Sequence, residues 1–271
     1  MTDEDAAALE RAAADLAAAG GARIRAALAE GFEIDDKSGG DEERIANPVT
    51  AIDRAVEAML RAEIARRFPD HAVIGEEDAV AGPEDAAIAW ALDPIDGTVN
   101  FVNALPLYAC SIGVLAHGRP VAGAVWCAAT PALGPGTYHG RAGGGLFLDG
   151  VRVERSGRAS RCPVAGAPGG RTGEGLAARM TGSSAIELAF VAAGAMAASL
   201  SRRTAVWDVA GGLALVAAAG GLMVEEGADW SPFRSFADGE DASPAAIARW
   251  CGTVIGAGDE AAALRLAMAQ A

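Results

Sequence analysis

The sequence predicts a layered protein of helices and sheets, in which an N-terminal α+β lobe (residues 1–139) packs beside a C-terminal α/β lobe (residues 140–271). Ala-rich stretches with helical periodicity occur near the N-terminus, and short apolar runs separated by turn residues follow them. After residue 160 short strands alternate with helical segments, a pattern typical of α/β architecture. A chain of 271 residues is long enough to bury two packed lobes.

Two helices are predicted before residue 70. Residues 4–30 are Ala-rich and helical in pattern, and residues 50–68 place five apolar side chains on one face: Ile52, Val56, Met59, Leu60 and Ile64. Thr50 and Asp53 have the spacing of a capping box at the start of the second helix. The segment 35–48 between the helices is polar and contains glycine, so we expect an exposed, mobile loop there.

Two apolar runs of strand length, 72–75 and 88–92, lead directly into carboxylates. Glu76 and Glu77 follow the first run, and Asp93 follows the second. Side chains at the ends of strands often converge on a cleft, so these acidic residues are candidates for a site.

Hairpins are predicted in the middle of the chain. Residues 107–128 read as strand, tight turn and strand, and Asp149-Gly150 marks a second hairpin. Further on, the segments 183–200 and 208–221 and a C-terminal helix at about 258–270 supply the alternating pattern of the second lobe.

The composition excludes several classes of partner. With 22 basic and 36 acidic residues the net charge is −14, which disfavours nucleic acid and means that a small anionic substrate needs bound cations. The longest uncharged stretch, 209–224, has 16 residues with four glycines, too few to span a bilayer. The acidic N-terminus lacks a signal-peptide pattern, so we expect no membrane association and a cytoplasmic location. The four cysteines are scattered without a zinc-binding pattern, and we expect buried thiols.

The segment LDPIDGTVNF (92–101) holds two closely spaced aspartates. Because Pro94 restricts the backbone, the Asp93 and Asp96 carboxylates and the Ile95 carbonyl can point the same way. Hard oxygen ligands in this arrangement suit Mg²⁺, and Gly97-Thr98 offers backbone N–H groups to a phosphate. Simpler interpretations exist for the other two candidates: Asp208 could be a helix N-cap, and Glu76 a solvated turn residue.

Four motifs together carry a family resemblance. NPVTAIDRAVEAML (47–60), IGEE (74–77), LDPIDGTVNF and VWDVAGG (206–212) occur in the order and spacing of the inositol monophosphatase family, which the chain resembles over nearly its whole length. The resemblance implies a layered α-β-α-β-α sugar-phosphatase sandwich with a metal site in the cleft between two lobes. It also implies two or three Mg²⁺ ions, a homodimer and inhibition by lithium.

The resemblance also implies roles for the individual residues. Glu76, Asp93 and the Ile95 carbonyl would hold one Mg²⁺; Asp93, Asp96 and Asp208 would hold a second; and a third, weaker ion would use Glu76 and water. Gly97 and Thr98 would bind the substrate phosphate. Asp53 would hydrogen-bond Thr98 and, with Glu76 and Thr98, help to activate the attacking water. No protein nucleophile is needed, because two cations clamp the attacking and leaving oxygens.

The residues expected to contact the alcohol part of the substrate, here called the substrate wall, depart from the family pattern. Ser201 stands where inositol-specific members have a glutamate, and Ala218 replaces another family glutamate. Ser183 and Ser184 match a substrate-facing turn, where they either contact a polyol or cap the following helix. We therefore take Ser183, Ser184 and Ser201 as substrate-binding candidates.

Three basic residues are further candidates for contacts with the substrate or the metals. Arg202 and Arg203 either meet a second phosphate group or are surface charges. Lys37 matches a family position near the metals, in a loop that is longer than usual.

The default function is hydrolysis of inositol 1-phosphate to inositol and phosphate. Fructose-1,6-bisphosphatase, histidinol-phosphatase and 3′-phosphonucleotide phosphatase activities are alternatives, although DGTVNF lacks the Lys-Glu pair common in the nucleotide branch. A second class of function is a catalytically idle regulator that binds metal and a phosphorylated ligand. In either case we expect a small phosphorylated metabolite as partner.

Overall fold

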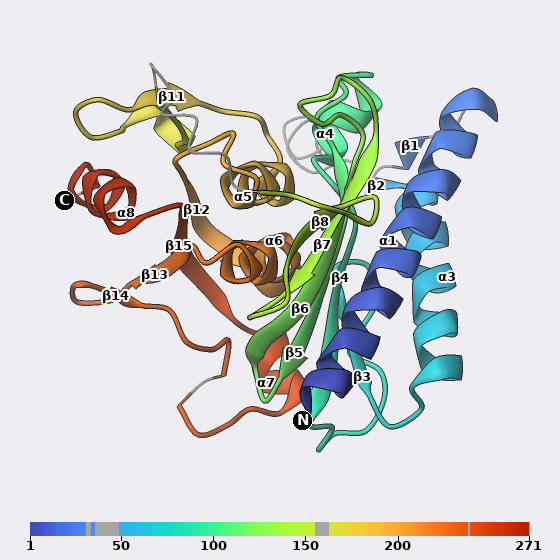
Figure 1. Cartoon of the computed structure of the whole chain (residues 1–271). Coiled ribbons are helices and arrows are strands. Elements are labelled where there is room, and N and C mark those ends of the chain that lie inside the picture. The colour runs from blue at the N-terminus through green and yellow to red at the C-terminus, as the bar shows by residue number, and fades with distance from the viewer. Residues whose placement is uncertain (31–33, 36–48, 155–162, 238, 271) are drawn as a thin grey trace.

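The computed structural model describes residues 1–30, 34–35, 49–154, 163–237 and 239–270. Its elements form five layers in the order α-β-α-β-α, which confirms the predicted layered fold (Figure 1). The helices α1 (Asp3–Glu30) and α3 (Ala51–Arg67) cover the outer face of a seven-stranded sheet. The helices α5 (Ser184–Ala192) and α6 (Val206–Ala218) lie between this sheet and a six-stranded sheet. The C-terminal helix α8 (Glu260–Met268) covers the far side.

The seven-stranded sheet follows the chain order. Its strands are β3 (Ala72–Gly75), β4 (Ile88–Asp96), β5 (Ala109–Ala116), β6 (Arg119–Cys127), β7 (Gly136–Arg141), β8 (Gly145–Leu148) and β9 (Val151–Arg152). The pair β3–β4 is parallel and every other pair is antiparallel. Both predicted hairpins are present. Residue 140 falls within β7, and the last strand of this sheet ends at Arg152.

The six-stranded sheet joins segments that are distant in sequence. Its order is β11 (Ala177–Arg179), β10 (Val164–Gly166), β12 (Ala198–Ala205), β15 (Cys251–Ala257), β13 (Leu222–Glu226) and β14 (Trp230–Pro232). Short elements complete the fold: α4 (Thr98–Val102), α7 (Pro244–Ala248), the 3₁₀ helix Pro168–Gly170 and the paired strands β1 (Ile34–Asp35) and β2 (Val49–Thr50). Residues 36–48 of the expected loop lie outside the described part of the chain, and Asp35 ends β1.

The predicted helices are confirmed within a few residues. On α3 the apolar face is buried at Ile52, Val56, Leu60 and Ile64, whereas Met59 is half-buried. None of the described helices is both long enough and apolar enough to cross a lipid bilayer.

The expectation of buried thiols holds in part. Cys110 and Cys127 are buried, whereas Cys251 at the start of β15 is exposed, and Cys162 lies outside the described residues. Burial raises the pKa of both buried thiols, because the thiolate loses hydration.

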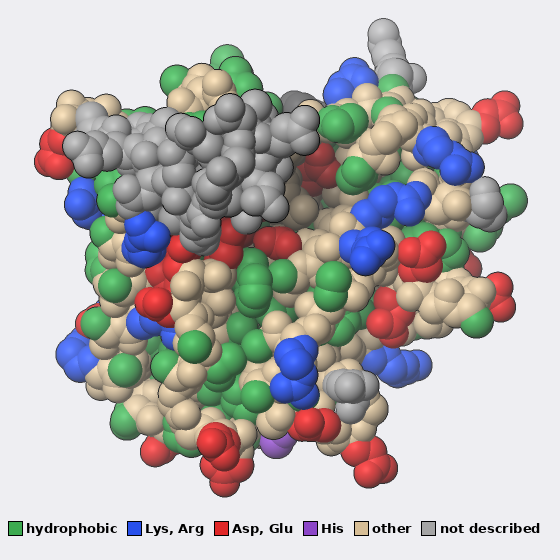
Figure 2. Space-filling view, turned by 180° about the vertical axis from the view of Figure 1, so that it is seen from behind, with side chains coloured by type: hydrophobic (Ala, Val, Ile, Leu, Met, Phe, Trp, Pro, Cys, Tyr) green, Lys and Arg blue, Asp and Glu red, His purple; other side chains and the backbone are tan. Residues whose placement is uncertain are grey.

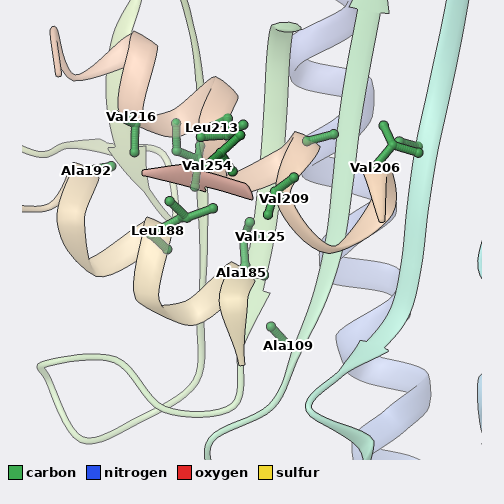
Figure 3. Packing of buried hydrophobic residues seen from close by; sticks show 14 of the residues in the cluster. Ala109, Val125, Ala185, Leu188, Ala192, Val206, Val209, Leu213, Val216 and Val254 are labelled. Carbon is green, nitrogen blue, oxygen red and sulfur yellow. The ribbon is translucent and has the colours of Figure 1, made fainter. Parts of the chain in front are cut away.

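The middle layer is packed through small residues. A Cβ added to Gly113 of β5 would lie 2.5 Å from Cβ of Ala210 on α6, so helix and sheet backbones approach closely here. Figure 3 shows Leu188 of α5, Leu213 of α6 and Val254 of β15 together in the same buried cluster. Since α6 contacts strands of both sheets, this layer is a core common to the two halves of the chain.

Replacement of Gly21 in α1 with alanine is expected to lower the melting temperature. The added Cβ would fall 2.1 to 2.3 Å from ring atoms of the buried Trp126, and overpacking of this kind costs about 1–3 kcal/mol or more. At an open position the same change would instead stabilise a helix by about 1 kcal/mol. Thermal denaturation of Gly21→Ala beside Ala22→Ser, a change at an exposed neighbour, checks this. An unchanged or higher melting temperature for Gly21→Ala would contradict the packing described.

Candidate functional site

The structure gathers most of the predicted site residues around one pocket of about 200 Å³. The predicted residues that line it are Glu76, Asp93, Ile95, Asp96, Gly97, Thr98 and Asp208. Val99 and Gly182, which were not among the predicted site residues, complete the lining. Figure 2 shows acidic side chains in and beside a hollow on one face of the molecule. A larger hollow of about 770 Å³, near the start of α1, is mainly apolar and contains none of these residues, so chemistry rather than size identifies the site.

The parallel pair β3–β4 places the first two carboxylates. Gly75 pairs with Leu92, so Glu76 and Asp93 leave the same edge of the sheet. Glu57 of α3 holds the turn after β3, because its buried carboxylate accepts hydrogen bonds from the backbone N–H groups of Glu77 (2.9 Å) and Asp78 (3.0 Å).

Pro94 interrupts the pairing of β4 with β5, and this break shapes the next part of the site. Asp93 pairs with Ser111 and Asp96 with Ala109, so β4 contains one extra residue between them, a β-bulge. After the bulge, the Thr98 hydroxyl donates to the Ile95 carbonyl at 3.0 Å.

Gly97 is required where the chain leaves β4 for α4. Its φ of 89° favours glycine, and an added Cβ would lie 2.9 Å from the Leu107 carbonyl oxygen and 3.2 Å from that of Gly182. The segments around residues 97 and 182 therefore meet backbone to backbone at the pocket.

The turn before α5 fixes Asp96. Oδ2 of Asp96 accepts hydrogen bonds from the Ser183 hydroxyl and, at 2.9 Å, from the Ala185 N–H. Ser183 is also the N-cap of α5 and accepts from the Ile186 N–H, which confirms the capping interpretation for this residue. Ser184 is the half-buried first residue of α5 and Ser201 is buried in β12; neither lines the pocket.

Asp208 lies in the first turn of α6. The helix begins at Val206, so Asp208 is not the N-cap residue, but its Oδ2 accepts from the Ala205 N–H at 2.8 Å and from the Thr204 hydroxyl. These bonds leave its other oxygen available to the pocket.

Burial and neighbouring negative charges destabilise the ionised form of the site aspartates. Burial raises the pKa of Asp93 well above its usual range, and the negative charges of Glu76, Asp96, Asp208 and the buried Asp53 raise it further. Burial likewise raises the pKa of Asp96 and of Asp208, although the hydrogen bonds that each accepts oppose the shift. A positive charge within the pocket would relieve this repulsion.

The residues fit a divalent cation. Oδ1 of Asp93 is buried and accepts no hydrogen bond within the described part of the chain. Among the same residues no ion pair joins Asp93, Asp96 or Asp208 to a basic side chain. A buried carboxylate oxygen without a donor, beside further carboxylates and a carbonyl, is a donor set typical of Mg²⁺ sites.

The carboxylates line the pocket without converging on one point. In the ranges that the structure covers, no three Asp, Glu, His or Cys side chains form a closed group around a metal position. Oδ2 of Asp96 and Oδ2 of Asp208 are instead held by backbone N–H groups at the start of α5 and of α6.

Of the basic residues singled out from the sequence, Arg202 and Arg203 lie outside the pocket lining. Arg202 donates to the Gln270 side chain near the end of α8. Arg203 is exposed, with φ of 46°, where the pairing of β12 with β15 shifts register. Lys37 lies outside the described residues.

Three supporting residues were missed by sequence reasoning. Glu57 follows Asp53 by four residues on the buried side of α3, and Thr204 precedes Asp208 by four, so local spacing was an available signal for both. Glu187, a buried carboxylate of α5, follows the predicted site residue Ser183 by four positions, so the same kind of signal was available for it.

Comparison with known proteins agrees with this geometry. The model of the inositol monophosphatase family matches residues 5–244. The chain is 35% identical over 255 residues to the inositol-1-monophosphatase SuhB of Mycobacterium tuberculosis, covering 82% of this chain and 85% of that protein. It is 34% identical over 188 residues to a fructose-1,6-bisphosphatase/inositol-1-monophosphatase of Thermotoga maritima, covering 65% and 71% respectively. The structure of inositol monophosphatase from Anabaena superimposes with a TM-score of 0.73 at 26% identity, covering 97% of this chain and 95% of that one. The chain belongs to the inositol monophosphatase family.

Proposed function

We propose that this protein is a Mg²⁺-dependent phosphatase that hydrolyses inositol 1-phosphate or a closely similar small phosphate monoester. The observation that carries the proposal is the pocket shared by Glu76, Asp93, Asp96 and Asp208 with Gly97 and Thr98. The names of the relatives from M. tuberculosis and T. maritima support the same activity.

Each cation would be held by oxygen atoms of this pocket. In the proposal, Glu76, Asp93 and the Ile95 carbonyl hold one ion; Asp93, Asp96 and Asp208 hold a second; and Glu76 with water holds a weaker third. The chemistry that bound Mg²⁺ supplies is neutralisation of phosphate and leaving-group charge and a lowered pKa of water.

The remaining work falls to the protein. The backbone N–H groups of Gly97 and Thr98 would bind the phosphate oxygens and set its orientation. The Thr98 hydroxyl has one proton, which the structure directs to the Ile95 carbonyl. With that carbonyl on a cation, the proton would turn to Asp53, and the hydroxyl oxygen would accept a hydrogen bond from the attacking water. Glu76 would accept a proton from that water, with Asp53 supporting Thr98 from the buried side of α3.

The substrate wall leaves room for a different alcohol group. Ser183 uses its hydroxyl on Asp96 and on its own helix, so a polyol contact would come from Ser184 or, after rearrangement, Ser201. Neither residue supplies a carboxylate, so discrimination between inositol and other alcohols would be weak.

A phosphate-release panel tests the proposal. Inositol 1-phosphate, fructose 1,6-bisphosphate, histidinol phosphate and a nucleotide 3′-phosphate are compared with Mg²⁺ and with EDTA. The expected result is release that requires Mg²⁺ and is fastest for inositol 1-phosphate. A strong preference for the nucleotide would overturn the substrate assignment. Metal binding without release from any ester would instead favour a regulatory protein.

Assembly and location are separate parts of the proposal. We propose a homodimer in the cytoplasm. Sedimentation equilibrium and fractionation of the source cells test the two statements separately, and a monomer at micromolar concentration would exclude the first.

A further inference from the structure

The buried carboxylate of Glu187 lies outside the pocket lining yet is fully engaged by hydrogen bonds. Its side chain on α5 is 7% exposed. Oε1 accepts from the Thr181 N–H (3.0 Å) and the Thr181 hydroxyl (2.9 Å), and Oε2 accepts from the Ser199 hydroxyl (2.7 Å). A buried charge is costly without such donors, so a carboxylate kept here calls for an explanation beyond packing.

The donors to Glu187 lead directly to Asp96. The Thr181 hydroxyl can donate its single proton to Glu187 at 2.9 Å or to the Ser183 carbonyl at 3.1 Å, and the carboxylate is the stronger acceptor. With its proton directed to Glu187, the same hydroxyl accepts from the Ser183 N–H at 3.2 Å. Ser183 in turn donates to Oδ2 of Asp96.

A second contact holds this turn from the opposite side. Nδ2 of Asn100 on α4 donates to the carbonyl oxygens of Thr181 and Leu107, each at 2.7 Å. Gly182, at the centre of the turn, has φ of 78°, and an added Cβ would lie 3.0 Å from the same Asn100 nitrogen. The turn 181–183 is therefore clamped between the helix that follows β4 and Glu187 of α5.

Ser199 extends the connection into the six-stranded sheet. It is fully buried in β12, the strand that continues to Thr204, whose hydroxyl donates to Asp208. Glu187 thus contacts both the turn that fixes Asp96 and the strand that leads to Asp208.

We propose that Glu187 is a positioning residue of the cation site. By holding Thr181 and Ser199 it keeps the 181–183 turn in place, so that Ser183 and Ala185 occupy Oδ2 of Asp96 and leave Oδ1 for the cation. This inference rests on the proposed function, in which Asp96 is a cation ligand. Support one step removed from a metal ligand commonly changes metal affinity or activity by about 10–100-fold when it is lost.

The test is a Mg²⁺ titration without substrate, in which the melting temperature is measured at each Mg²⁺ concentration. Glu187→Ala is expected to need about tenfold more Mg²⁺ than wild type for half of the maximal stabilisation. Glu187→Gln should stay near wild type, because its amide oxygen can still accept from Thr181. Thr181→Val, which removes only the hydroxyl, should shift the midpoint in the same direction as Glu187→Ala.

Glu10 offers a matched control. It is also a carboxylate 7% exposed, but it lies on α1 and pairs with His139 (2.9 Å) and Arg141 (3.5 Å) instead of site residues. Glu10→Ala should change the melting temperature at zero Mg²⁺ and leave the Mg²⁺ midpoint unaltered.

The outcomes separate this inference from the proposed function. Mg²⁺ midpoints equal to wild type for both Glu187→Ala and Thr181→Val would overturn the positioning role, whatever their melting temperatures. If Glu187→Ala does not fold, the Thr181→Val midpoint alone decides in the same way. A wild-type protein that binds Mg²⁺ but releases no phosphate would overturn the proposed phosphatase activity. The Mg²⁺ midpoints of the variants would still decide whether Glu187 positions the cation site.

Discussion

Asp93→Asn is expected to abolish Mg²⁺-dependent phosphate release and, at the same time, to raise the melting temperature of the metal-free protein. Asp93 is proposed to contact both main cations, and loss of their transition-state stabilisation, roughly 4 kcal/mol, corresponds to about 10³-fold in rate. Without metal, the ionised Asp93 is buried near four other carboxylates that raise its pKa. A neutral amide of the same shape removes that repulsion.

The sign of the stability change follows from linkage. An acid whose folded pKa lies above its unfolded value stabilises the fold below the unfolded pKa and loses that contribution as the pH rises through the folded pKa. In EDTA the wild type therefore loses stability as the pH rises above the unfolded pKa of Asp93, and Asp93→Asn does not. A gain of about 1 kcal/mol corresponds to about 2–4 °C in a chain of this size.

Calorimetry in EDTA and a phosphate assay in Mg²⁺ measure the two effects. Asp85→Asn, at an exposed position, is the control and should change neither. Retained activity in Asp93→Asn, or a lower melting temperature without metal, would refute the placement of Asp93 at the centre of the acidic cluster.

Glu57→Ala is expected to cause the largest loss of stability among single changes near the site. Glu57 is completely buried, pairs with Nε of Arg61 at 2.7 Å and accepts two backbone N–H groups from the turn that follows Glu76. Removing one partner of a buried ion pair costs about 3–5 kcal/mol, because the other charge is left without compensation. Activity should fall as well, since the turn that carries Glu76 loses its anchor.

Urea denaturation and the phosphate assay check this prediction. Glu63→Ala on the same helix is the matched control, because Glu63 pairs with Arg66 and Arg67 at the partly exposed surface of the helix and should have a far smaller effect. Glu57→Gln, which still accepts from the turn, should lie between wild type and Glu57→Ala. Equal losses for Glu57→Ala and Glu63→Ala would mean that burial adds nothing to the interaction.

Local sequence patterns predicted the helices and strands better than they predicted which strands pair with each other. The helices α1 and α3 and both hairpins were recognisable because periodicity and turn residues act within a few positions. The six-stranded sheet pairs β10 with both β11 and β12 and places β15 between β12 and β13, and no local signal specifies such pairings.

The candidate site divides in a similar way. The four carboxylates were recognisable from their motifs, and the structure places them around one pocket. The bond from Ser183 to Asp96 spans 87 residues, and the bonds that hold Thr181 to Glu187 depend on how that turn folds. Donors of this kind depend on tertiary contacts, which short-range spacing does not encode.

The central helices α5 and α6 make the two halves of this chain mutually dependent for solubility. They are encoded after residue 183, yet α6 covers β5 and β6 of the sheet encoded before residue 153. A fragment that ends after β9 would leave that sheet face bare and prone to aggregate. A split form of this protein should therefore reassemble only when both halves are expressed at the same time.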